Sequence, residues 1–201
     1  TKCRTIQSMK LYRAVPRQKA PSSQELHARS TTLRAPSNVP YVVDNLWESF
    51  RPDNMPSRRN AVYASPTPEL ALANASSLTT TDRAAYAVFE VQIQGSATLA
   101  HLDISDARHH ADVRLLPKFI LDILGKDFSL LPLQERLAVA PLFMPYMRRD
   151  ELLALARHSP RLQECLDKAE QVSTFWPNAR PHPCADRAGE LFFELAQGST
   201  Y

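Results

Sequence analysis

The stretch KLYRAVP, Lys10 to Pro16, predicts a β-strand with an arginine at its centre. Apolar residues flank Arg13 in the period-two pattern of a strand, so its side chain is expected to leave one face of a sheet among small and aromatic neighbours. A half-buried guanidinium needs an anion. That anion is either an internal Asp or Glu, or the phosphate oxygens of a ligand, which match the fork of donors that an arginine presents.

Four further segments have the residue pattern of β-strands. They are residues 61–65 (AVYAS), 86–93, 99–105 (LAHLDIS) and 189–195 (GELFFEL). In the last of these, Leu191, Phe193 and Leu195 alternate with Glu190, Phe192 and Glu194, so the two sets should occupy opposite faces. After AVYAS, Thr67 is placed to cap a helix whose first residue is Pro68.

Helical patterns account for most of the remaining chain. Ser22 and Glu25 have the spacing of a capping box, and apolar residues recur at helical spacing between Val42 and Phe50. RPDNMPSRRN, residues 51–60, reads as a loop. From about residue 112 to residue 173 every segment reads as an amphipathic helix. We therefore predict one α+β domain, residues 1–201, with an all-helical insertion at about 112–173. Phe143, Met144 and Met147 are expected in the core of this insertion, the alternative being an exposed docking face.

Composition excludes several classes of protein. The chain has 201 residues, 44% of them hydrophobic, and a net charge of +3. Residues 1–60 hold 11 Lys and Arg against 4 Asp and Glu, which is +7, and the rest holds 13 against 17, which is −4. This modest excess lacks the clustering that nucleic acid binding requires. We predict no spanning helix and no membrane partner, and four glycines with no glycine-rich motif argue against a Rossmann nucleotide site.

Metal and cysteine chemistry is not expected either. Cys3, Cys165 and Cys184 are too scattered for a zinc site or a disulfide framework. The run HLDISDARHHAD contains His101, His109, His110 and Asp112 without helical ligand spacing, so it is interpreted as a solvated loop.

Arg13, Ser65 and Glu190 are the residues on which a site can be built. Taken singly, Ser65 is a turn or cap residue and Glu190 a solvated strand carboxylate. Together, KLYRA, the strand-ending Ser65-Pro66-Thr67 and the glutamate that opens GELFFEL resemble the arginine-serine-glutamate (cholera-toxin-like) class of ADP-ribosyltransferases.

The resemblance implies a split antiparallel β core and a cleft that binds NAD as substrate, with no metal. It implies that Arg13 binds the phosphates, that Ser65 orients the glutamate or the nicotinamide ribose, and that Glu190 stabilises the ribosyl cation. Thr67, Tyr63 and Phe192 are further candidates for contact with NAD because they neighbour these residues. Glu194 is the alternative catalytic carboxylate.

The resemblance also implies a biological setting. The chain is similar in size to bacterial effectors, type III secreted proteins among them, that are delivered into the host cytosol as toxins, and we expect a monomer. Arginine-modifying members carry a glutamate where this chain has Ala188, so a Thr or Ser hydroxyl, ubiquitin included, becomes the expected acceptor. An NAD glycohydrolase of the same fold and a non-catalytic binding module remain the alternatives.

Overall fold

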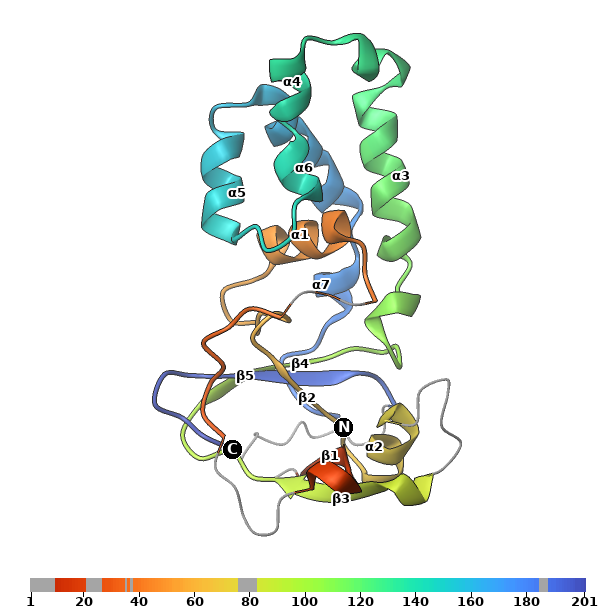
Figure 1. Ribbon diagram of the computed structural model, residues 1–201, viewed down its shortest axis with the longest axis vertical. Coiled ribbons are helices and arrows are strands. Elements are labelled where there is room, and N and C mark those ends of the chain that lie inside the picture. The colour runs from red at the N-terminus through yellow and green to blue at the C-terminus, as the bar shows by residue number, and fades with distance from the viewer. Residues whose placement is uncertain (1–9, 21–26, 35, 37, 76–82, 185–187) are drawn as a thin grey trace. The chain divides into compact units, whose positions relative to one another are not determined.

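The computed structural model describes residues 10–20, 27–34, 36, 38–75, 83–184 and 188–201. The chain divides into two compact units, each built from segments that are distant in the sequence (Figure 1). The β unit comprises Thr1–Thr32, Asp53–Asp106 and Ala179–Tyr201, and the helical unit comprises Leu33–Pro52 and Ala107–Asn178. The predicted insertion at 112–173 lies within the second segment of the helical unit.

The β unit contains two small antiparallel sheets. Strand β1 (Leu11–Pro16) pairs with β3 (Tyr86–Val91), and Arg13 lies opposite Phe89. The second sheet has the order β2–β5–β4, formed by Val62–Ala64, Leu191–Leu195 and Ala97–His101. These strands match the sequence predictions, although β4 begins two residues before LAHLDIS and ends at His101.

One bridge links β1 to the end of β2. The Tyr12 amide donates to the Ser65 carbonyl at 2.9 Å, and the Ser65 amide donates to the Tyr12 carbonyl at 2.8 Å. Because an antiparallel bridge of this kind sets two residues side by side, the residue next to Arg13 lies against Ser65.

The core of the β unit confirms the predicted alternation of β5. Leu191, Phe193 and Leu195 pack in one apolar cluster with Leu11 of β1 and Leu99 of β4. Each of these side chains is at most 2% exposed. The face of β5 that carries Glu190, Phe192 and Glu194 is therefore the opposite one.

Short helices complete the β unit. The predicted cap of α2 (Pro68–Ala75) is confirmed, since the Leu70 amide donates to Thr67 Oγ1 at 3.3 Å. Single 3-10 turns occupy Arg17–Lys19 and Arg83–Ala85. The helix predicted from Ser22 and Glu25 lies outside the described residues.

The helical unit contains nine described helical segments. They are α1 (Tyr41–Phe50), η4 (Ala107–His109), α3 (Asp112–Leu124), η5 (Lys126–Leu130), α4 (Leu133–Leu137), η6 (Ala140–Phe143), α5 (Arg149–Ala156), α6 (Pro160–Val172) and α7 (Phe175–Asn178). The helix expected between Val42 and Phe50 is thus present, and it belongs to this unit.

Asp112 is the polar centre of the helical unit. Its carboxylate is fully buried and accepts hydrogen bonds from Trp47 Nε1 at 3.0 Å, from Ser173 Oγ at 2.7 Å and from the Thr174 amide at 3.2 Å. The Trp47 ring stacks on Phe175 with centroids 3.9 Å apart. The interpretation of residues 101–112 as a solvated loop was therefore wrong for Asp112 and also for His110 and His101, which are 8% and 0% exposed.

Two residues predicted for the core of the insertion lie at its surface. Phe143 is 43% exposed and Met144 is 50% exposed. Asn45 Nδ2, from α1, donates to the carbonyl of Leu142 at 2.9 Å and to that of Met144 at 2.7 Å. This buried amide holds the backbone of the segment in which the Phe143 and Met144 side chains are exposed.

The described residues form a mixed fold of helices and small antiparallel sheets, compatible with the α+β prediction. Among them, no helix is both long enough and apolar enough to span a bilayer.

Candidate functional site

Arg13 is half-buried in the middle of β1. Its Nη1 donates to the Tyr201 hydroxyl at 2.6 Å, and its guanidinium carbon lies 5.6 Å from the centroid of that ring. Among the described residues no carboxylate forms an ion pair with Arg13. The internal salt bridge is thus not found in the part of the chain that the structure describes, where the Arg13 guanidinium bonds the phenol of Tyr201.

Ser65 is 3% exposed and follows the last residue of β2. Its Oγ accepts a hydrogen bond from Asn74 Nδ2, on α2, at 3.1 Å. The cap of α2 is Thr67, so of the two simple roles predicted for Ser65, turn or cap residue, the cap is wrong, while Ser65 does lie where the chain bends between β2 and α2. Thr67, predicted to contact NAD, uses its hydroxyl oxygen in this cap.

Glu190 precedes the first residue of β5 and is 9% exposed. Its amide donates to the Ile104 carbonyl at 2.6 Å, and its carbonyl accepts from the Leu102 amide at 2.8 Å. Because both backbone groups are bonded to the segment after β4, the Cα of Glu190 is held in place. The interpretation of Glu190 as a solvated carboxylate was wrong.

The register of β2 and β5 relates Glu190 to Ser65. Ala64 lies opposite Leu191, so the antiparallel register continues to Ser65 opposite Glu190. Tyr63 lies opposite Phe192 on the same face, with ring centroids 5.6 Å apart. Four of the six predicted site residues, Ser65, Glu190, Tyr63 and Phe192, thus share one face of the three-stranded sheet.

Register alone does not bring the Arg13 side chain to that face. Tyr12, bridged to Ser65, shares the direction of the Ser65 side chain, and Arg13 alternates with Tyr12 on the side of Leu11 and the apolar core. The backbone of Arg13 adjoins Ser65, while its guanidinium reaches Tyr201.

Arg58, in the loop between α1 and β2, is a site residue that sequence reasoning missed. Its Nη2 lies 3.7 Å from Glu190 Oε1, and the two side chains are 8% and 11% exposed. Tyr201 and Asn74, the partners of Arg13 and Ser65, were also missed. No motif marks any of the three. Arg58 and Tyr201 are defined by contacts with segments distant in the sequence, and Asn74 contacts Ser65 from the helix that follows it.

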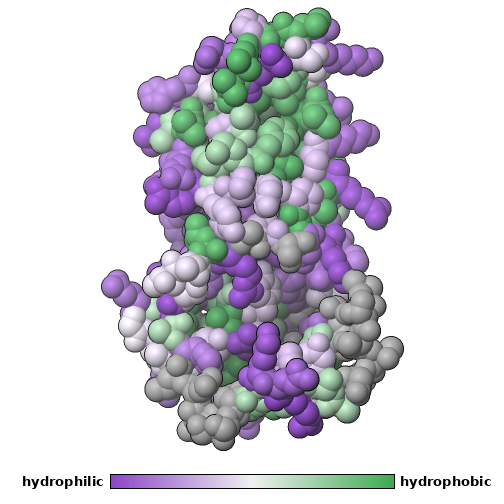
Figure 2. Space-filling model, in the orientation of Figure 1, coloured by the Kyte–Doolittle hydropathy of each residue, from purple (hydrophilic) through white to green (hydrophobic). Residues whose placement is uncertain are grey.

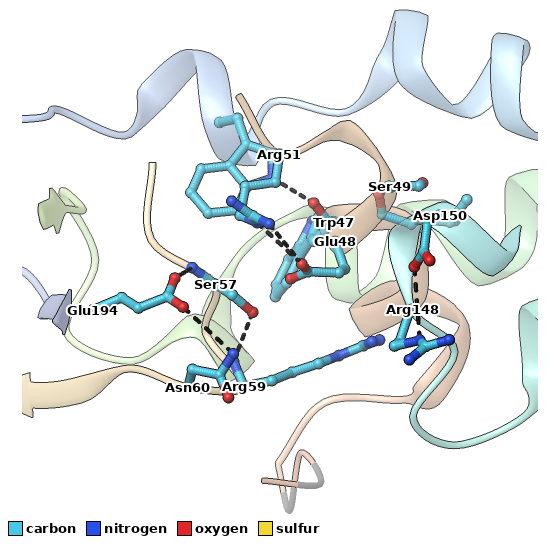
Figure 3. A network of polar contacts seen from close by, with 12 residues as sticks. Trp47, Glu48, Ser49, Arg51, Ser57, Arg59, Asn60, Arg148, Asp150 and Glu194 are labelled. Carbon is cyan, nitrogen blue, oxygen red and sulfur yellow. Dashed lines mark hydrogen bonds and ion pairs between the residues drawn. The ribbon is translucent and has the colours of Figure 1, made fainter. Parts of the chain in front are cut away.

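Glu194, the alternative catalytic carboxylate, holds the loop before β2 (Figure 3). Its Oε2 accepts from the Ser57 amide at 2.7 Å, and its Oε1 lies 3.4 Å from Asn60 Nδ2 and 2.6 Å from Arg29 Nη2. Three donors from two segments make this carboxylate a structural anchor.

His101 and Gly189 fix the backbone directly before Glu190. His101 Nδ1 accepts from the Cys184 amide at 3.1 Å, which assigns the proton to Nε2, 3.2 Å from the Gly189 carbonyl. A Cβ at position 189 would overlap the Leu102 carbonyl. Glycine is therefore required directly before Glu190.

The comparisons with known proteins add no relative. A scan against protein-family models, a search of curated proteins and a search of solved structures each found no match to this chain. Within the described residues, no group of three or more His, Cys, Asp or Glu side chains could hold a metal ion.

Proposed function

We propose that the protein is a mono-ADP-ribosyltransferase, which transfers ADP-ribose from NAD to a side chain of a target protein. The proposal starts from the likeness of KLYRA, Ser65-Pro66-Thr67 and the Glu190 strand to the arginine-serine-glutamate class. The observation that carries it furthest is that Ser65 and Glu190, both buried, directly follow and precede the paired residues Ala64 and Leu191, and that Ser65 is bridged to the Arg13 strand. The two small antiparallel sheets fit the split β core of that class.

Each residue type suits one part of the reaction. The bond between the nicotinamide nitrogen and ribose C1′ breaks, its electron pair leaves with nicotinamide, and a nucleophile of the target attacks the ribosyl cation. Glu190 would accept a hydrogen bond from the ribose 2-hydroxyl that strengthens as positive charge develops. Ser65 would orient the ribose or the carboxylate, and Arg13 would bind the NAD phosphates.

The aromatic pair Tyr63 and Phe192 is our candidate for contact with the nicotinamide ring. The rings neighbour Ser65 and Glu190 on the same sheet face. Phe192 is 0% exposed and Tyr63 is partly exposed, so Tyr63 is the ring that would contact nicotinamide, with the buried Phe192 ring packed beside it.

The acceptor we favour is a Thr or Ser hydroxyl, because Ala188 stands where arginine-modifying enzymes of the class carry a glutamate. The attacking hydroxyl would lose its proton to solvent as the new C1′–O bond forms. Host ubiquitin is a first candidate target, in keeping with a bacterial effector delivered into the host cytosol.

The helical unit is the part we assign to target recognition. All exposed large apolar side chains among the described residues belong to it, and green patches lie over its visible face (Figure 2). Exposed apolar surface of this kind commonly marks a protein-binding site.

The test is incubation of the protein with labelled NAD, alone and with host-cell lysate, followed by intact-mass analysis of labelled proteins. Transfer adds one ADP-ribose unit to a target, and Glu190→Gln should lower the rate about 10²-fold or more. Glu90→Gln is the matched control, since Glu90 is an exposed glutamate of β3.

Two results would redirect the proposal. Free ADP-ribose without labelled protein, lost in Glu190→Gln, would identify an NAD glycohydrolase that uses water as the acceptor. No consumption of NAD in either reaction, with full biological effect retained by Glu190→Gln, would identify a non-catalytic binding module.

A further inference from the structure

The segment Ser57–Asn60 interacts with both glutamates on one face of β5. Glu194 holds it through the Ser57 amide and the Asn60 side chain, and Glu190 is approached by the Arg58 guanidinium. The two anchor points flank Arg58 in the sequence. The backbone that carries Arg58 is therefore fixed on either side of it, which limits where its guanidinium can lie.

Burial makes the contact between Arg58 and Glu190 consequential. Both side chains are about nine-tenths covered, and at 3.7 Å their charges interact with little solvent screening. Removing one charge leaves the other poorly solvated, so the second side chain must move toward water or change its protonation state. The orientation of Glu190 thus depends on Arg58.

We infer that Arg58 is a positioning residue for Glu190, holding the carboxylate in the orientation in which it accepts a hydrogen bond from the ribose 2-hydroxyl. This inference rests on the proposed function. In this role Arg58 acts through the glutamate, because its guanidinium approaches the carboxylate of Glu190. Other titratable or charged groups in the segments packed around Glu190 are Tyr63 on β2, His101 at the end of β4, Asp103 after β4, Arg59 beside Arg58 and Glu194 on β5 itself.

A positioning role predicts a split between the kinetic constants. Without Arg58, NAD still binds through the residues proposed to contact it, but the Glu190 carboxylate is misplaced in the transition state. Arg58→Met should lower kcat for NAD cleavage about 10²-fold and change KM less than about threefold. Arg58→Lys keeps the charge without the planar fork, so it should recover at least about tenfold of the loss.

The experiment is a double-mutant cycle on the full chain with Arg58→Met, Glu190→Gln and the double variant. We expect that Arg58→Met lowers kcat only slightly when Glu190 has already been replaced by Gln. Arg17→Met is the matched control, since Arg17 is an exposed arginine whose Nε bonds only the Ala84 carbonyl in the described hydrogen bonds. A rise in KM with unchanged kcat, or equal losses in both Glu190 backgrounds, would overturn the inference.

Thermal melting of the parent protein, the two single variants and the double variant distinguishes failure of this inference from failure of the proposed function. If no NAD is consumed, the proposed function fails, and the melting temperatures still report whether the pair is coupled. Coupling appears as a loss in the double variant smaller than the sum of the single losses. Additive losses would overturn the role of Arg58 with or without activity. Where Arg58→Met does not fold, the same cycle is run with Arg58→Lys.

Discussion

Replacing Glu194 by alanine should destabilise the β unit through the loop before β2. The Glu194 side chain is only 13% exposed, and its carboxylate receives the Ser57 amide at 2.7 Å, Arg29 at 2.6 Å and Asn60 at 3.4 Å. Alanine removes all three acceptor contacts at once. Loss of the bond to the Ser57 amide costs the most free energy, because Ser57 is 4% exposed and water cannot readily replace the carboxylate.

The magnitude follows from these three contacts. Loss of the acceptor for a buried amide costs about 1–3 kcal/mol. Arg29 is 43% exposed, so its ion pair is screened and contributes at most about 1 kcal/mol. The long Asn60 contact adds little. We expect a decrease of about 2–4 kcal/mol in the free energy of unfolding, with Glu194→Gln losing about half as much because its amide oxygen can still accept from Ser57.

The assay is urea unfolding followed by circular dichroism, together with hydrogen exchange of the peptide that contains residues 53–60. Trp47 and Trp176 both lie in the helical unit, so tryptophan fluorescence would report the wrong unit. Arg29→Ala separates the exposed ion pair from the buried amide contact. The reasoning fails if Glu194→Ala stays within about 0.5 kcal/mol of the parent, or if Arg29→Ala costs as much as Glu194→Ala.

Three further predictions concern the helical unit. Asp112→Ala strands the Trp47 indole, the Ser173 hydroxyl and the Thr174 amide, and should cost about 3 kcal/mol or more in unfolding followed by tryptophan fluorescence; a loss below about 1 kcal/mol contradicts it. Burial lowers the pKa of His110, against a smaller rise caused by Asp112, so the folded state favours neutral histidine. Neutral His110 contributes fully to the free energy of unfolding above the ordinary histidine pKa, and this contribution is lost as the pH falls through the lowered pKa of the folded state. The unfolding midpoint should therefore decrease between about pH 7 and pH 5, and His110→Gln should make this decrease smaller. Burial raises the pKa of Cys165 to about 11, so a disulfide reagent at neutral pH should label the half-buried Cys184 far faster, as counted by peptide mass; equal rates would refute this.

The parts of the fold that local rules govern were readable from the sequence. Alternation predicted the core face of β5, because side chains on a strand must alternate, and the sequence Thr67-Pro68 predicted the start of α2, because a hydroxyl there satisfies a free amide. Both rules act within a few residues. Neither needs knowledge of what lies across the core.

The parts that were missed depend on contacts between distant segments. The helix expected between Val42 and Phe50 was predicted correctly, but periodicity cannot tell that Trp47 of this helix packs on Phe175. Phe143 and Met144 fit an apolar helix face, yet both side chains are exposed, in a segment whose backbone carbonyls bond Asn45 of the distant helix α1. The segment that contains Arg58 was read only as a loop, because its partner Glu190 lies far along the chain, directly before the last strand.

The nearby arginine also changes how Glu190 can contribute to catalysis. At 3.7 Å and an effective dielectric constant of about 20, the Arg58 charge and the Glu190 carboxylate attract each other by roughly 4–5 kcal/mol. A ribosyl cation near Glu190 therefore faces an ion pair whose two charges largely cancel. The field of the carboxylate alone is then a weak source of stabilisation. A directed hydrogen bond from Glu190 to the ribose 2-hydroxyl depends on position instead, and the Arg58 contact preserves position.

This reasoning leads to a substrate test. NAD and its analogue without the 2-hydroxyl of the nicotinamide ribose should be cleaved at rates whose ratio falls about tenfold or more when Glu190 is changed to Gln, because the hydroxyl then loses its charged acceptor. Comparing the ratio between two enzyme forms cancels the different intrinsic reactivities of the two substrates. A ratio that stays the same in Glu190→Gln, while both rates fall together, would mean that Glu190 acts through its charge, and that the Arg58 contact must break before the glycosidic bond does.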